Sequence, residues 1–193
     1  MRPMADQTIH ERDLEFLLAF LNSGEPGGTD HMATAEALRA WLDSHDQGDA
    51  AGEPGPEDAR NARRVRAAIR DFLDTRDGGR LDERTLPALD GAANAGVLRV
   101  AADPARGLTL VPAGRGIDAV FARLLATLAT ASILGTLERI KLCGECRWAY
   151  FDRSRNRSRV WCDMASCGTR QKVRSYRERQ RSPRQSSDGD GAG

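Results

Sequence analysis

The sequence predicts a mainly α-helical N-terminal domain with one small β-hairpin, an α+β arrangement, followed by a small domain organised by four cysteines and ending in a basic helix. Apolar residues recur at helical spacing through much of the first part, between stretches rich in Gly and Pro. The four cysteines all lie within the 25 residues from Cys143 to Cys167. We therefore expect domains at 1–138 and 139–182, with a tail over 183–193.

Four helices are expected before the hairpin. The first covers 10–22, where leucines recur every three or four residues. Thr34 is a suitable N-cap for a short second helix. A third helix begins at Pro56, because proline and the two acidic residues that follow it are favoured in a first turn. A weaker helix covers 82–94, and a loop rich in Gly, Asp and Pro is expected over 46–56.

The hairpin and the most regular helix come next. Two short β-rich runs, 97–100 and 108–111, bracket a Pro/Gly turn and predict a β-hairpin. The apolar face over 117–134 predicts a helix that runs directly toward Cys143. This stretch carries charges, so it does not predict a membrane span, and the N-terminal residues lack the apolar segment of a secretory signal. We expect a cytoplasmic protein with reduced cysteines.

Charge is distributed unevenly along the chain. The formal net charge is only +1. Between Arg139 and Arg184, however, 14 basic residues face 4 acidic ones, a net charge of +10, which leaves −9 for the rest of the chain. Such a division indicates a polyanionic partner for the C-terminal end alone.

The spacing of the cysteines predicts a metal site. Cys143 and Cys146 are separated by two residues, and Cys162 and Cys167 by four. In a reducing compartment this pattern favours one structural Zn²⁺ bound by four thiolates over two disulfides or unrelated cysteines, and the histidines lie far upstream. Four protein ligands close the coordination shell, so we expect no catalytic role. The sequence also lacks the phosphate-binding, serine-hydrolase and metalloprotease motifs of common enzymes.

Little apolar surface surrounds the cysteines, so metal binding is expected to supply most of the folding free energy there, on the order of 10 kcal/mol. The aromatic and aliphatic residues available for a small core are Trp148, Tyr150, Phe151, Val160 and Trp161. Without the metal we expect this region to be unfolded.

A basic helix is expected from Cys167 onward, and it is preceded by a loop in which arginines alternate with Ser and Asn. A helix of this kind fits the major groove of duplex DNA, where Arg can contact guanine, while loop arginines reach phosphates. A solvated basic face, or one docked on the acidic N-terminal part, is the alternative. The candidate nucleic-acid contacts are Arg153, Arg155, Arg157, Arg159, Arg170, Lys172, Arg174, Arg177 and Arg181.

The run LCGECRWAYFDRSRNRSRVWCDMASCGTRQKVRSYRERQR resembles the CGNR zinc finger family. That family combines a CxxC pair with an aromatic-x-D-x-S-R-N stretch, then R-x-W-C-x-M-x-x-C-G-N-R and a basic helix. The matching residues are Tyr150, Asp152, Ser154, Arg155, Asn156, Arg159, Trp161, Cys162, Met164, Cys167, Gly168 and Arg170. Thr169 replaces the family's usual Asn. The resemblance implies a zinc-dependent DNA-binding finger.

The N-terminal part is similar to the ABATE domain that usually precedes this finger, a ligand-sensing domain of stress-response regulators. The similarity rests on Leu18-Ala19-Phe20-Leu21-Asn22-Ser23, where the family shows L-D-F-V-N-T, and on the later Trp41-Leu42. Ala19 stands at the family's Asp, so no role of that acid carries over. The pairing implies a transcription regulator with a sensor in front and a finger behind.

Our leading hypothesis is a zinc-dependent, DNA-binding transcriptional regulator associated with the nucleoid. The alternatives are an RNA-binding zinc protein, a zinc–thiolate redox switch and a protein-interaction module. A small-molecule effector and a homodimer are further expected partners, since paired half-sites increase specificity. The residues weakly favoured for an effector site are Asn22, Ser23, Trp41 and Arg70.

Overall fold

The computed structural model describes residues 11–24, 28–75, 83, 86–104 and 107–181. The tail expected over 183–193 lies outside the described residues, as does most of the segment from 76 to 85. The elements in chain order are α1 (Glu11–Leu21), α2 (Ala35–Ser44), α3 (Gly48–Ala51), α4 (Pro56–Thr75), α5 (Leu86–Ala95), β1 (Leu98–Asp103), β2 (Gly107–Pro112), α6 (Ile117–Ile133), the 3₁₀ turn η1 (Leu137–Arg139), β3 (Ile140–Leu142), β4 (Ala149–Phe151), the π-helical turn η2 (Met164–Gly168) and α7 (Thr169–Arg181).

The mainly helical α+β fold with a C-terminal four-cysteine unit is confirmed, and so are the local signals at the helix starts. The Oγ1 atom of Thr34 accepts a hydrogen bond of 3.2 Å from the backbone N–H of Ala37, which caps α2. Helix α4 begins at Pro56, and the carboxylate of Asp58 in its first turn accepts a bond of 2.7 Å from the Gly55 N–H.

The β1–β2 hairpin is also confirmed. Its strands are antiparallel, with Val100 opposite Leu110 and Asp103 opposite Gly107. Three details differ from the sequence-based expectation. The expected loop over 46–56 contains the short helix α3, a second hairpin (β3–β4) forms beside the cysteines, and α7 begins after the separate π-helical turn η2.

The sequence predicts that the helix over 117–134 runs directly toward Cys143, and this prediction is wrong. Helix α6 ends at Ile133, and the chain then turns through Gly135, whose φ of 63° favours glycine. Turn η1 follows and leads into β3, which approaches Cys143 as an extended strand. The change of direction brings β3 and β4 back onto the helical body.

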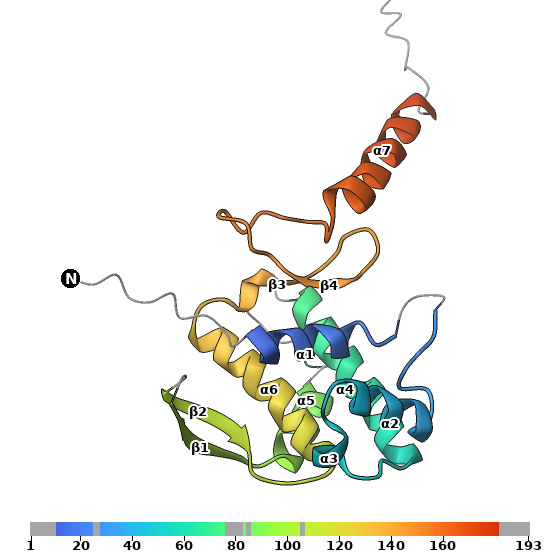
Figure 1. Ribbon diagram of the computed structural model, residues 1–193. Helices are drawn as coiled ribbons and strands as arrows, with labels where there is room; N and C mark the ends of the chain where they lie inside the picture. Colours follow the sequence, from blue (N-terminus) through green and yellow to red (C-terminus); the bar gives the residue numbers. More distant parts are fainter. Residues whose placement is uncertain (1–10, 25–27, 76–82, 84–85, 105–106, 182–193) are drawn as a thin grey trace, which may run out of the picture.

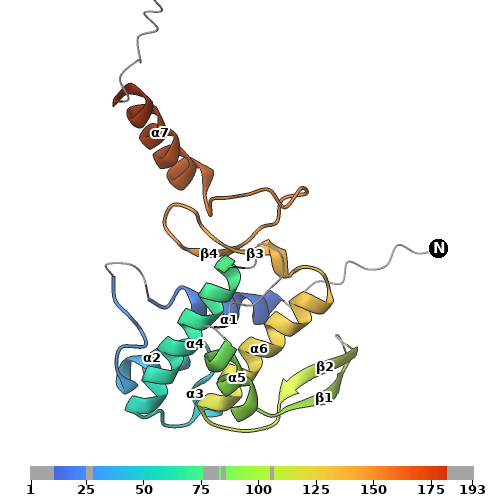
Figure 2. The ribbon, with the colours of Figure 1, turned by 180° about the vertical axis from the view of Figure 1, so that it is seen from behind.

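One hydrophobic core joins the helices to the second hairpin. The core contains Leu17 of α1, Leu42 of α2, Ile69 of α4 and Leu124 of α6, none of which is exposed. Ile140 of β3 is completely buried in the same cluster, and Ala149 of β4 nearly so. In Figure 1 and Figure 2 the hairpin accordingly lies above α1 and next to the upper end of α4.

Helix α7 projects away from this body (Figure 1; Figure 2). It is held at its N-terminal end by η2, and most of its side chains are exposed. Within the described part of the chain, none of the helices has the length and apolar character that crossing a bilayer requires.

Candidate metal centre

The four cysteines converge on one point. Their Sγ atoms all lie within 4.8 Å of one another. The sulfur of Cys162 is 3.6 Å from that of Cys146 and 3.8 Å from that of Cys167. Four sulfurs bound tetrahedrally to one Zn²⁺ at about 2.3 Å are separated by about 3.8 Å, whereas a disulfide requires about 2.05 Å. The cysteines are free thiols in this arrangement and form a site for one structural zinc ion.

The first two ligands lie in a tight turn at the end of the β3–β4 hairpin. The Cys143 N–H donates to the Trp148 carbonyl at 2.8 Å, and the Arg147 N–H donates to the Cys143 carbonyl at 2.9 Å. Arg147, rather than Gly144, adopts the left-handed conformation, with φ 63°. Gly144 instead allows a close approach to Val160, whose Cγ1 lies 3.3 Å from the position of an added Cβ.

The fourth ligand comes from the π-helical turn that leads into α7. The carboxylate of Asp163 caps this turn by accepting a bond of 2.7 Å from the Ser166 N–H. The Cys167 N–H donates to the Asp163 carbonyl at 3.1 Å. Because Cys167 closely precedes the start of α7, the metal site fixes the N-terminal end of the basic helix.

The electrostatics of the apo cluster favour ionisation of Cys143 over ionisation of Cys162 or Cys167. Burial opposes ionisation of Cys143, but backbone N–H donors at Cys146, Cys162 and Glu145 outweigh burial and lower the pKa of Cys143 to about 6. Burial and hydrogen bonding among the thiols raise the pKa of Cys162 and of Cys167. A bound divalent cation favours the ionised form of its thiol ligands, so a zinc ion would stabilise the thiolates of this cluster.

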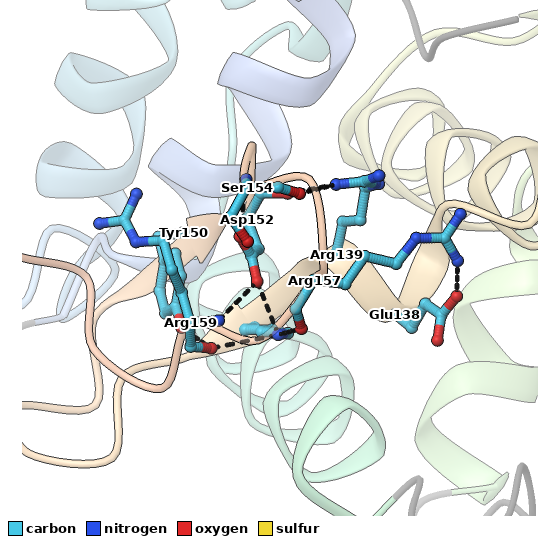
Figure 3. A network of polar contacts seen from close by, with 8 residues as sticks. Glu138, Arg139, Tyr150, Asp152, Ser154, Arg157 and Arg159 are labelled. Atoms are coloured by element: carbon cyan, nitrogen blue, oxygen red, sulfur yellow. Dashed lines mark hydrogen bonds and ion pairs between the residues drawn. The ribbon is translucent and has the colours of Figure 1, made fainter.

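A buried carboxylate supports the segment between the two cysteine pairs (Figure 3). The Oδ2 atom of Asp152 accepts from Lys141 Nζ at 2.8 Å and from the Arg159 N–H at 3.0 Å, and Oδ1 accepts from the Ser154 N–H at 2.9 Å. Burial alone would raise the pKa of Asp152, but these donors hold it far below its usual range. Asp152 thus shapes the loop that carries the candidate phosphate contacts.

The small core around the cysteines contains fewer of the aromatic and aliphatic residues than the sequence predicted. Tyr150 is buried against Cys143 and Cys167, and Trp161 is packed beside them. Trp148 and Val160, however, are 41% and 54% exposed. Phe151 packs against the larger core of the helical body instead. Of the five residues expected in this core, Tyr150 and Trp161 therefore pack with the four cysteines.

The arginines of the basic loop differ in exposure and in their partners. Arg153, Arg155 and Arg157 are all exposed, and two of them form surface ion pairs, Arg153 with Glu11 and Arg157 with Glu138. The guanidinium of Arg159 donates to the Cys162 carbonyl and lies over the Tyr150 ring, 5.5 Å from its centroid. Arg159 therefore makes structural contacts within the finger.

Helix α7 carries the other candidate contacts. Arg170, Lys172 and Arg177 are exposed, and Arg174 forms an ion pair with Glu145. The side chain of Arg181 lies outside the described residues. Nucleic-acid contact by these residues stays a prediction.

The four residues favoured for an effector site make internal contacts. The Asn22 side-chain amide forms two hydrogen bonds with the backbone of Ala149. Its Nδ2 donates to the Ala149 carbonyl at 2.9 Å, and its Oδ1 accepts from the Ala149 N–H at 2.7 Å. Arg70 donates to the carbonyls of Leu21 and Arg147 at 2.8 and 2.6 Å. Arg70 thereby joins α4 to the turn over 143–148 that carries the first two zinc ligands (the zinc turn), and Asn22 joins the end of α1 to β4 directly after it.

Ser23 and Trp41 are likewise engaged within the body. Ser23 Oγ donates to the Phe20 carbonyl at 2.7 Å and accepts from Arg66 at 2.9 Å. The Trp41 ring stacks on His45, with centroids 4.2 Å apart. The effector role of these residues stays a prediction. A cavity of about 300 Å³ lies elsewhere, between α4, α5 and α6, and its lining includes Val65, Asp118 and Phe121.

Sequence reasoning missed the roles of Lys141 and Glu145. In the sequence Lys141 is only one of the 14 basic residues of the C-terminal segment, although its Nζ also donates to the Arg159 carbonyl at 3.1 Å. Glu145 had no assigned role, yet its side chain is almost completely buried and paired. The available signal for Glu145 was its position: it is an acidic residue between two zinc ligands in an otherwise basic segment.

Comparison with protein families agrees with this geometry. Residues 139–180 match the CGNR zinc finger model, and residues 14–135 match the ABATE model, described as a putative stress-induced transcription regulator. Both are regulatory or zinc-finger families rather than enzyme families. A comparison with curated proteins gave no match. The ABATE match covers well over half of the chain, and the finger that follows it provides all four zinc ligands, so this protein belongs to the ABATE family and carries a C-terminal CGNR zinc finger.

Proposed function

We propose that this protein is a zinc-dependent transcriptional regulator that binds duplex DNA through α7 and the loop over 153–159. The observation that carries the proposal is the exposure of a basic helix whose N-terminal end is fixed by a zinc ligand. An α-helix with its side chains is about 10–12 Å wide, and the major groove is about 12 Å wide. The projection of α7 from the body leaves room for such docking (Figure 1).

The charges on α7 support a polyanionic partner. Arg170 and Arg177 lie two turns apart on one face of the helix, and Lys172 adds an exposed cation on the opposite side. Arg155 adds an exposed cation from the loop. Each phosphate that these residues neutralise releases counterions, so binding is expected to weaken steeply with salt.

The direct test is fluorescence anisotropy with the zinc-loaded chain and labelled duplex DNA at increasing salt. The double variant R170A/R177A is expected to lower affinity and to reduce the salt dependence by about two counterions. R99A, which removes an exposed arginine from β1, is the matched control and is expected to bind like the wild type. Wild-type protein without affinity for duplex DNA at low salt would exclude the proposal.

RNA binding is separated from DNA binding in the same assay. Trp148 and Tyr176 are the exposed aromatic side chains of the described finger that are available to stack on unpaired bases. Competition between duplex DNA and a structured RNA hairpin therefore decides between the two. Preferential displacement by RNA would favour the second candidate.

We further infer that the N-terminal domain senses a small molecule or stress signal, in keeping with the family description. The effector is expected to change DNA affinity by binding the helical body. Such a ligand binds only the folded state, so it should raise the thermal midpoint of the zinc-loaded chain. A library screen by thermal shift, followed by anisotropy with DNA, tests this inference.

A further inference from the structure

Glu145 lies in the turn between two zinc ligands, and only 7% of its side chain is exposed. Its Oε1 atom accepts a hydrogen bond from Arg174, in the second turn of α7. Its Oε2 atom is shielded from solvent and has no hydrogen-bond partner among the described residues. A buried carboxylate with an unsatisfied oxygen is unfavourable, so the ion pair with Arg174 must offset part of that penalty.

The surroundings of Glu145 explain why Arg174 is the cation that it holds. Four thiolates on Zn²⁺ carry a net charge of −2, and Glu145 adds a further negative charge to the same turn. The nearby cations Lys141 and Arg147 are engaged with Asp152 and Asp74. Arg174 is therefore drawn toward the zinc turn, and its side chain is still 57% exposed there.

The Glu145–Arg174 ion pair holds α7 at a point beyond its N-terminal end. The helix has 13 residues, and a helix of this length is about 20 Å long and marginally stable in isolation. Cys167 and η2 hold the helix only at its N-terminal end, and a single attachment there leaves the direction of the helix axis free to change. Arg174 adds a second point of attachment, about one turn and a half further along the helix.

We propose that Glu145 is a positioning residue that fixes the direction of α7 on the zinc turn, and that Arg174 acts through this contact rather than on a DNA phosphate. The inference rests on the proposed function, in which α7 is the helix that contacts DNA. It divides the arginines of α7 by role. Arg174 lies between Arg170 and Arg177 along the same side of α7. Arg170 and Arg177 contact the nucleic acid, whereas Arg174, held by Glu145, sets the orientation of the helix.

The first test compares E145Q, R174A and E145Q/R174A by anisotropy with duplex DNA, each as the zinc-loaded full chain. A positioning role predicts that both single variants lose a similar affinity, about tenfold, and that the double variant is no weaker than either. E36Q, which changes an exposed acid of α2, is the control.

Two results would overturn the proposal. Tighter binding by E145Q would mean that Glu145 competes with DNA for Arg174. An unchanged affinity for E145Q, combined with a salt dependence lowered by about one counterion in R174A, would make Arg174 an independent phosphate contact.

A second measurement does not depend on DNA. Amide hydrogen exchange over 170–177 is expected to accelerate in E145Q and R174A while each protein retains one zinc per chain. Unchanged exchange would reject the positioning role. Faster exchange in a chain whose wild type binds no DNA would retain the Glu145–Arg174 attachment and reject the proposed function.

Discussion

Lys141 donates a hydrogen bond of 2.8 Å to Asp152, whose carboxylate is completely excluded from solvent. The lysine belongs to β3 and the aspartate directly follows β4, so the ion pair closes the second hairpin at its open end. The same carboxylate binds the N–H groups of Ser154 and Arg159. One side chain therefore connects the hairpin to the chain that returns to the metal.

D152N is expected to destabilise the zinc-loaded protein by about 3–5 kcal/mol, because it leaves the Lys141 ammonium partly buried without a counter-charge. Chemical denaturation followed by circular dichroism measures this loss. The control is D43N, which removes an exposed partner of Arg39 and should cost less than about 1 kcal/mol. An equal loss of unfolding free energy in D152N and D43N would show that the buried ion pair stabilises the fold no more than the exposed one.

The contribution of Asp152 also depends on pH. Its pKa in the folded protein lies below the unfolded value of about 3.9, so its stabilisation is complete above that value and is lost as the pH falls through it toward the folded pKa. The difference in unfolding free energy between wild type and D152N should be constant from about pH 7 to about 5 and shrink below about 4. Thiolate protonation affects both proteins and largely cancels in this difference.

The local sequence signals were sufficient for most helices. Thr34 and Pro56 mark helix starts through chemistry that operates within one turn, and the structure has the helices where these residues place them. The zinc ligands were equally predictable, because two closely spaced pairs of cysteines in a reducing compartment are typical of a tetrathiolate metal site.

Contacts between distant segments were not predictable in this way. Asn22 and Ala149 are 127 residues apart, and the amide of Asn22 has the same sequence signature whether it binds a ligand or a backbone. The burial of Ile140 in the helical core and the return of Arg174 to Glu145 depend on the path of the chain after Gly135. Propensity and periodicity describe single elements and carry no information on that path.

Removal of zinc is expected to affect the helical body as well as the finger. Ile140 and Ala149 belong to the shared core, and the hairpin that carries them ends at Cys143. Chelation should abolish the helical signal of α7 and lower the thermal midpoint of the remaining cooperative transition, and re-addition of zinc should restore both. A body that melts at the same temperature with and without zinc would show that the two parts fold independently.

N22A tests whether Asn22 is a structural connection. The change leaves the backbone N–H and carbonyl of Ala149 without partners in a partly buried position, which should cost about 1–3 kcal/mol. N156A alters an exposed asparagine in the finger and should change stability by less than about 0.5 kcal/mol. Denaturant titration compares them. Wild-type stability of N22A would leave the side chain available for an effector.

Arg70 and Asp74 offer a contrast along one face of α4. Arg70 caps two carbonyls in a partly buried position, where burial lowers its pKa, so R70A should cost about 1–3 kcal/mol. Asp74 pairs with Arg147 at 2.7 Å, but both side chains are about half exposed, and D74N should cost less than about 1 kcal/mol. Thermal unfolding ranks the two variants. The reverse order would make the ion pair the main link between α4 and the zinc turn.

Arg155 and Arg159 belong to the same basic loop but have different expected roles, Arg155 in DNA contact and Arg159 in the structure of the finger. Arg155 is exposed, so R155A should weaken DNA binding, reduce the salt dependence by about one counterion and leave stability unchanged. Arg159 donates to the Cys162 carbonyl and covers Tyr150, so R159A should lower the stability of the finger and its retention of zinc. Anisotropy, denaturation and competition for zinc by a chelator separate these effects. If R159A changed the salt dependence while stability and zinc retention stayed at wild-type values, the guanidinium would have to leave Cys162 for a phosphate when DNA is bound.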